Sequence, residues 1–152
     1  FIYRLAFTYL DYAEAENEAY DDASAREKAL VYLNRIRERA GVRQYTFDNV
    51  DPLDEQYIHL DNSQEALRKA IHAERRVELC FEDNRWYDIR RWKEAESLPE
   101  MTGDCYGMNS EGATSSTFYK RTVFQTRIWK RQYYWMPVYI DEYENNLKNK
   151  NS

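Results

Sequence analysis

The sequence contains few of the residues that build turns, phosphate loops and metal sites. Its 152 residues include only four glycines, three prolines, two cysteines and two histidines. Neither a glycine-rich phosphate loop nor a Gly-x-Ser-x-Gly motif is present. His59 and His72 lack the spacing of helical metal sites, and Cys80 and Cys105 lack metal-ligand spacing. We therefore expect no metal, no cofactor and no assembled nucleophile, whereas a disulfide between the two cysteines stays open.

Long apolar runs and an excess of basic charge are also missing. The longest apolar stretch, Tyr133 to Ile140, is short and contains Pro137, whereas a membrane-spanning helix needs about 20 apolar residues. The formal net charge of −5 argues against a nucleic-acid partner. No signal peptide is visible, and the chain opens inside a helical pattern without an initiator Met. We therefore expect a piece of a longer protein.

Aromatic residues, by contrast, are plentiful. The chain has 14 Tyr, 6 Phe and 4 Trp, which together make up 16% of its residues. Many of these rings can form the core of the fold. The remainder favours a surface that stacks on flat or ring-shaped ligands, sugars included, because Tyr and Trp combine an apolar face with a polar edge.

The first 41 residues predict two helices joined by a tight turn. Apolar residues at helical spacing predict the first helix from Phe1 to about Glu18. Ser24 is the predicted N-cap of the second helix, with Glu27 completing a capping box, and Gly41 is the predicted left-handed C-cap. Such a hairpin has the length of one tetratricopeptide unit. One pair cannot bury both of its faces, so we expect it to pack on a third helix or on further chain.

The remaining sequence predicts helices and long loops with little β structure. The fold class is therefore mainly α, with tetratricopeptide-like helix pairs. We expect a loop over 42–62, a third helix from Asn62 or Ser63 to about Phe81, a short helix over 85–94, a loop over 101–117, one or two short strands within 118–135, and a last helical turn over 138–146.

The predicted third helix carries two carboxylates on an apolar stripe. Glu74 and Glu78 fall on the face that also holds Leu67, Ile71 and Phe81, with Val77 and Cys80 beside it. Cys80 is expected to be a small buried residue. Buried carboxylates are costly unless cations reach them, and the sequence offers Arg85, Arg90 and Arg91 in the next turn, with Trp86 and Trp92 as core rings between them. We predict a structural ion-pair cluster of Glu74, Arg75, Arg76, Glu78, Arg85, Asp88 and Arg91.

Glu74 and Glu78 could alternatively form an acid/base pair for glycoside hydrolysis. Such pairs normally come from separate elements that face a cleft, whereas these two residues lie one turn apart on one helix. The neighbouring Arg residues favour the ionised form of both carboxylates, and a general acid must carry a proton. We therefore expect no catalytic residue in this chain.

Three segments carry a resemblance to a known family. The run EALRKAIHAERRVELCFEDNRWYDIRRW resembles the signature of the SusD/RagB family. YRLAFTYLDYAEAENEA and ALVYLNRIRERAGV resemble the helix pair of that family, and WMPVYIDEYENN is a weaker match to its closing segment. Together these segments cover most of the first 93 residues and part of the C-terminal region.

The resemblance implies a non-catalytic protein that binds nutrients at the cell surface. Residues 1–152 would form a C-terminal SusD/RagB-like domain of a longer, mostly helical lipoprotein of the Bacteroidetes outer membrane. Its N-terminal lipid anchor would lie outside this chain. Family members bind oligosaccharides, or in some cases peptides, and hand them to a SusC-like TonB-dependent transporter. A tetratricopeptide-like adaptor for a protein partner is the alternative, because of the helix pair.

The family's signature residues support its fold, so the resemblance transfers no ligand-binding residue. Physical reasoning instead directs attention to rings on predicted loops, because these can stack on sugars. Tyr45, Phe47, Tyr57 and Tyr106 are the candidate ligand-binding residues.

Overall fold

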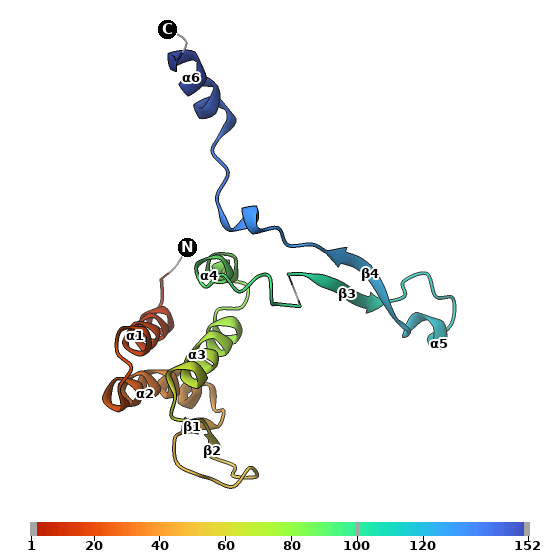
Figure 1. Ribbon diagram of the computed structural model, residues 1–152. Coiled ribbons are helices and arrows are strands. Elements are labelled where there is room, and N and C mark those ends of the chain that lie inside the picture. Colours follow the sequence, from red (N-terminus) through yellow and green to blue (C-terminus); the bar gives the residue numbers. More distant parts are fainter. Residues whose placement is uncertain (1–2, 100, 151–152) are drawn as a thin grey trace. The chain divides into compact units, whose positions relative to one another are not determined.

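The computed structural model describes residues 3–99 and 101–150, with side chains described up to residue 146. The chain divides into two compact units, Phe1–Arg85 and Trp86–Ser152, whose elements are labelled in Figure 1. The described residues form six α-helices, one 3-10 helix and four strands that make two small sheets. The predicted fold class, mainly α with little β structure, is confirmed.

The first unit begins with the predicted helix pair, α1 (Leu5–Ala19) and α2 (Ala23–Ala40). Gly41 ends α2 in the left-handed region at φ 68°, as predicted. The predicted N-cap was wrong by two residues. Asp22 caps α2, because its carboxylate accepts a hydrogen bond from the backbone N–H of Ala25 at 2.9 Å, and Ser24 lies inside the helix.

Helix α3 (Gln64–Glu78) packs against both α1 and α2, which provides the third helix that the pair requires. Ser63 caps it, as one of the two predicted residues, by accepting from the N–H of Ala66 at 3.2 Å. Asn17 and Gln64 tie α1 to α3 through reciprocal side chain–backbone hydrogen bonds of 3.1 and 2.7 Å. The buried core contains Phe7, Leu10, Ala13, Ala29, Leu33, Ile36, Leu67, Ala70, Ile71 and Leu79.

Helix α3 ends earlier than predicted, and this changes the exposure of the residues that follow it. Its C-cap is the buried Leu79, and Phe81 then adopts φ 65°. This left-handed turn takes the chain off the helical stripe. The expected burial of Cys80 was wrong, because Cys80 is an exposed free thiol. Phe81, expected on the apolar stripe, is fully exposed, and Val77 beside the stripe is 72% exposed.

A two-stranded parallel sheet interrupts the predicted loop between α2 and α3. Strands β1 (Gln44–Thr46) and β2 (Tyr57–His59) pair in register, with Tyr45 opposite Ile58. Asn34 of α2 fixes β1, because its amide donates to the carbonyl of Tyr45 and accepts from the N–H of the same residue, both at 2.8 Å. Pairing across ten intervening residues is a tertiary event that local sequence patterns do not predict.

The second unit combines short helices with an antiparallel hairpin. Helix α4 (Asn84–Arg91) starts at the end of the first unit, and strands β3 (Gly103–Met108) and β4 (Arg121–Arg127) pair with a bulge between Cys105 and Tyr106. The remaining elements are α5 (Ser115–Phe118), a 3-10 helix (Arg131–Tyr134) and α6 (Ile140–Lys150). The strand predicted within 118–135 is confirmed as β4.

The prediction of a structureless loop over 101–117 was wrong. This segment supplies β3, whose sequence GDCYGM has little intrinsic strand propensity and is held by its partner β4. The hairpin tip requires glycine at position 112. A Cβ atom there would lie 2.5 Å from the backbone nitrogen of Phe118 at the end of α5.

Candidate functional site

The two carboxylates of α3 are held by cations from α2 and from the residue before α1. Arg37 of α2 pairs with Glu74 at 2.5 Å, and Arg4 pairs with Glu78 at 2.5 Å, while Arg39 makes a second ion pair with Glu78. Glu74 is only 7% exposed. The sequence had placed the cations in the turn after α3. Long-range packing of the helices supplies them instead, and the carboxylates act as cross-braces between helices.

Other predicted members of the cluster form ion pairs within their own units. Arg75, 5% exposed, pairs with Asp11 of α1 at 2.6 Å and approaches Glu14 at 3.8 Å. Asp88 is buried and pairs with Arg91 within α4 at 2.9 Å. The other two predicted members differ in exposure, because Arg76 is exposed and Arg85 is half-buried. The carboxylates therefore lie among guanidinium groups, which suits a scaffold.

Arg4 links the start of the chain to the turn after α3. Its guanidinium donates to Glu82 at 2.6 Å, to Glu78 at 2.5 Å and to the carbonyl of Glu78 at 2.6 Å. The hydrogen bonds that Arg4 donates to Glu82 and Glu78 raise its pKa. The same contact with Arg4 lowers the pKa of Glu82. Both shifts favour the charged forms and so stabilise the pairing.

Two of the predicted ligand-binding rings make packing contacts within the first unit. Tyr45 and Phe47 are half-buried and pack against the core of the first unit. The guanidinium of Arg37 lies 4.2 Å from the centre of the Tyr45 ring, which is a cation–π contact. These contacts leave the two rings little free face for a ligand.

The other two predicted rings are more accessible but belong to different units. Tyr57 lines a pocket of about 320 Å³ beside β2, together with Arg43, Asp51 and His59. Tyr106 lies on β3 and is 50% exposed, with Arg121 over its ring at 4.0 Å. The four predicted residues do not form one described site.

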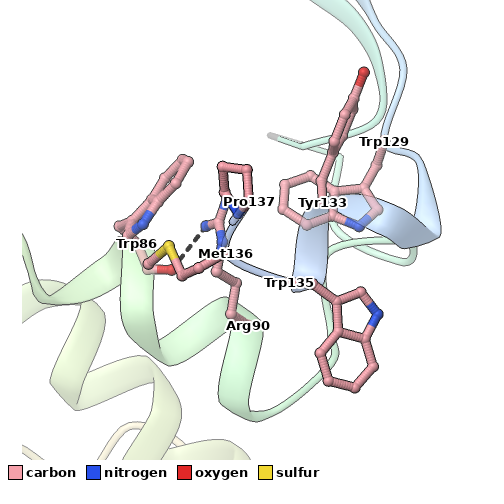
Figure 2. Close-up of a pocket in the computed structure, with 7 residues that line it drawn as sticks. All are labelled: Trp86, Arg90, Trp129, Tyr133, Trp135, Met136 and Pro137. Carbon is pink, nitrogen blue, oxygen red and sulfur yellow. Dashed lines mark hydrogen bonds between the residues drawn. The ribbon is translucent and has the colours of Figure 1, made fainter. Parts of the chain in front are cut away.

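The second unit contains a pocket that the sequence did not reveal. It has a volume of about 270 Å³ and lies between α4 and the segment around the 3-10 helix. Figure 2 shows the side chains that line it, which are mostly aromatic or apolar. We call it the aromatic pocket, and it is lined by Trp86, Arg90, Trp129, Tyr133, Trp135, Met136 and Pro137.

Among the described residues that line the aromatic pocket, Arg90 is the single cation. Its guanidinium carbon lies 3.1 Å from the centre of the Trp86 ring and 5.1 Å from that of Trp129. One of its nitrogens donates to the carbonyl of Trp86 at 2.9 Å, as the dashed line in Figure 2 marks. Burial lowers the pKa of Arg90, because desolvation disfavours the charged form. Within the described part of the second unit, no carboxylate pairs with this guanidinium.

Neighbouring rings hold Trp129 in place. Tyr133 meets it edge-on with ring centres 5.8 Å apart, and the Tyr134 ring lies 5.2 Å away. The hydroxyl of Tyr134 accepts a hydrogen bond from the backbone N–H of Glu96 at 3.3 Å, which links this segment to the region after α4. The indole N–H of Trp129 is buried and has no hydrogen-bond partner among the described residues.

The sequence analysis missed the aromatic pocket because it assigned Trp86 to the core. That expectation was wrong, because Trp86 is 50% exposed, and Trp135 is 73% exposed. Trp92, the other ring expected in the core, is half-buried. Trp86 and Arg90 are four residues apart on α4 and share a face, so the helical spacing could have indicated half of the site. The other half comes from residues 129–137, which only the fold brings to α4.

Three further findings concern the described residues as a whole. No group of three or more His, Cys, Asp or Glu side chains in residues 3–99 and 101–146 has the arrangement of a metal site. Within the described ranges, every helix is too short or too polar to cross a membrane. Cys80 and Cys105 are both free thiols.

Comparisons with known proteins agree on one family. The model of the SusD family matches residues 1–151. SusD-like protein P2 of Formosa agariphila is 40% identical over 90 residues, which cover 59% of this chain and 16% of that protein. A SusD-like protein of Bacteroides ovatus is 35% identical over 95 residues, 60% of this chain and 13% of the relative.

Solved structures give the same result across nearly the whole chain. The structure named BT4246 matches with a TM-score of 0.70 and 30% identity, covering 96% of this chain and 22% of that one. A SusD-like protein (BF3747) of Bacteroides fragilis matches with a TM-score of 0.65 and 30% identity, covering 92% and 23%. The chain therefore spans less than a quarter of the length of these relatives.

Proposed function

The chain belongs to the SusD family, and on that basis we propose that it serves in the non-catalytic binding of oligosaccharide or polysaccharide nutrients at the cell surface. The match of the family model to residues 1–151 is the observation that carries this proposal. The aromatic pocket supports it, because exposed indole rings beside a polar group suit the flat, partly apolar faces of sugars.

The proposal extends to the place of the protein in the cell. The bound glycan, or in some cases a peptide, is delivered to a SusC-like TonB-dependent transporter in the outer membrane. The protein is held at the outer surface by an N-terminal lipid anchor, and residues 1–152 form a C-terminal SusD/RagB-like domain of a longer chain. Detection of the native protein in lipid-labelled outer-membrane fractions tests the location, and its co-purification with a transporter tests the partner.

The geometry of Glu74 and Glu78 supports binding without catalysis. Arg37 pairs with Glu74, and both Arg4 and Arg39 pair with Glu78. Both carboxylates therefore serve as ion-pair partners inside the helical unit and do not face each other across a substrate cleft. The alternative of a tetratricopeptide-like adaptor rests on the α1–α2 pair alone and gains no support from the comparisons.

Calorimetric titration of the protein against a panel of oligosaccharides tests the function. We expect binding that weakens about tenfold in Trp86→Ala and in Trp135→Ala, because each change removes a stacking ring from the aromatic pocket. Tyr119→Ala is the control, since this ring is 70% exposed and does not line the pocket.

Two results would count against the proposal in different ways. If binding is unchanged in both Trp variants, the glycan binds at a site other than the aromatic pocket. Binding of no oligosaccharide and no peptide would remove the function itself.

A further inference from the structure

The aromatic pocket has an unbalanced polar composition. Its rings provide stacking faces, and its one charged group is the Arg90 guanidinium, which only donates hydrogen bonds, whereas the Tyr133 hydroxyl both donates and accepts. Among the described residues, no Asp, Glu, Asn or Gln side chain lines the pocket. A neutral sugar can form hydrogen bonds with these groups, but it does not balance the charge of Arg90. A ligand that carries negative charge matches them better.

Arg90 is held in a way that favours such a ligand. The Trp86 ring lies against the guanidinium, and the carbonyl of Trp86 takes only one of its N–H groups. A guanidinium has five N–H donors, so others remain for a ligand. Two parallel hydrogen bonds from a guanidinium match the geometry of a carboxylate.

Partial burial makes this cation costly to leave without a counter-charge. In the first unit, the buried guanidinium groups of Arg37 and Arg75 meet the carboxylates of Glu74 and Asp11. Arg90 has instead the rings of Trp86 and Trp129 and a backbone carbonyl. An anionic ligand group would supply the counter-charge that the described residues of its unit do not.

We propose that the aromatic pocket binds sugars that carry a carboxylate, with the uronate carboxylate on the guanidinium of Arg90 and the sugar ring stacked on the exposed indoles. This inference rests on the proposed function and names the class of glycan. Arg90 sets the preference for charge, and Trp86 and Trp135 supply stacking that does not depend on charge.

The test compares one glycan in two charge states. An oligogalacturonate and its fully methyl-esterified form are titrated into the protein by calorimetry at low and moderate salt. We expect the acid form to bind at least about tenfold more tightly, with an advantage that shrinks as salt rises. Arg90→Gln should abolish the advantage, so that the acid and the ester bind with equal affinity to this variant.

Two variants check that the effect belongs to Arg90. Lys130→Gln removes the same charge from an exposed residue that is next to Trp129 in sequence but does not line the pocket, and it should keep the preference. Arg90→Lys keeps the charge but loses the two parallel N–H donors of the guanidinium. Its preference for the acid form should therefore fall between those of the wild type and Arg90→Gln. Circular dichroism and the melting temperature establish that each variant is folded, and indole fluorescence gives a second measure of ligand at the pocket.

The failures of the two proposals are distinguishable. Equal binding of acid and ester, or an acid preference that survives in folded Arg90→Gln, would overturn the uronate inference and leave glycan binding standing. A sulfated oligosaccharide without uronate, or a glutamate-rich peptide, that binds more tightly than the uronate in an Arg90-dependent way would overturn it too. Binding of no sugar at all would overturn both proposals.

Discussion

The two units of the chain use aromatic and charged residues in opposite ways. In the first unit, ten apolar residues form a buried core, and ion pairs such as Arg37–Glu74 join its helices. In the described part of the second unit, the buried apolar residues are Ile89 and Ala95, while Trp86, Trp135 and other large side chains are at least half exposed. In the first unit, these side chains are buried or paired with each other, whereas in the second unit many of them are exposed to solvent.

This contrast separates scaffold from recognition. Paired guanidinium and carboxylate groups balance each other's charge, whereas Arg90 is stacked on rings and lacks a described carboxylate partner within its unit. The contrast teaches that an Arg-rich signature can contain both kinds of group within a few residues. Substitutions in each unit test this contrast.

Leu33→Ala should cause the largest loss in the free energy of unfolding. Leu33 is completely buried in the core of the first unit, and truncation of such a residue typically lowers the free energy of unfolding by about 2–5 kcal/mol. The matched change in the second unit, Ile128→Ala, affects a side chain that is 71% exposed and should shift it by less than about 0.5 kcal/mol. Urea titration followed by circular dichroism measures both. Equal losses of unfolding free energy in the two variants would contradict the contrast between a buried first unit and an exposed second unit.

Glu74→Gln should lower the free energy of unfolding by about 3 kcal/mol, because it leaves the guanidinium of Arg37 without its counter-charge in a buried setting. Glu65→Gln on the same helix breaks an exposed pair with Lys69 and should leave stability unchanged. Denaturant titration of the two variants gives the difference. If Glu74→Gln unfolds at the same denaturant concentration as the parent, the carboxylate is not a cross-brace.

Asn34→Ala removes both hydrogen bonds between α2 and the backbone of Tyr45. We expect a loss of about 1–2 kcal/mol, since the backbone groups of β1 lose their partners. Amide exchange at Tyr45 should accelerate. Asn34→Asp keeps an acceptor for the N–H of Tyr45 but no donor for its carbonyl, so its effect should be smaller than that of the alanine variant.

Acid should weaken the first unit modestly through two exposed or partly exposed carboxylates. Hydrogen bonds from Arg68 lower the pKa of Glu18, and those from Arg4 lower the pKa of Glu82. A folded-state pKa below the unfolded value of about 4.3 stabilises the fold above that pH, and the contribution is lost as pH falls through the folded pKa. Melting temperatures measured from pH 6 down to pH 2.5 should therefore drop below about pH 4.5. Arg68→Gln should reduce the slope, and an unchanged slope would contradict the assignment to Glu18.

Local patterns were sufficient for the helices and some of their caps. The apolar spacing in residues 1–40 and 64–78, the cap at Ser63 and the left-handed Gly41 all follow from interactions within a few residues. Local patterns failed where a partner is distant. Strand β3 depends on β4, and the carboxylates of α3 take their cations from α2 and from Arg4 before α1.

The sequence by itself determined the mainly helical fold class, the helix pair with its third helix, and the family, because helical periodicity and signature residues are contained in short segments. Only the tertiary structure decided which Arg meets which Glu, which rings are buried and where a pocket forms. Trp86 and Arg90 share a helix face by local geometry, yet Trp129 and Trp135 reach them only through packing of residues distant in sequence. Side-chain contacts across such separations depend on the path of the whole backbone, which no short segment specifies.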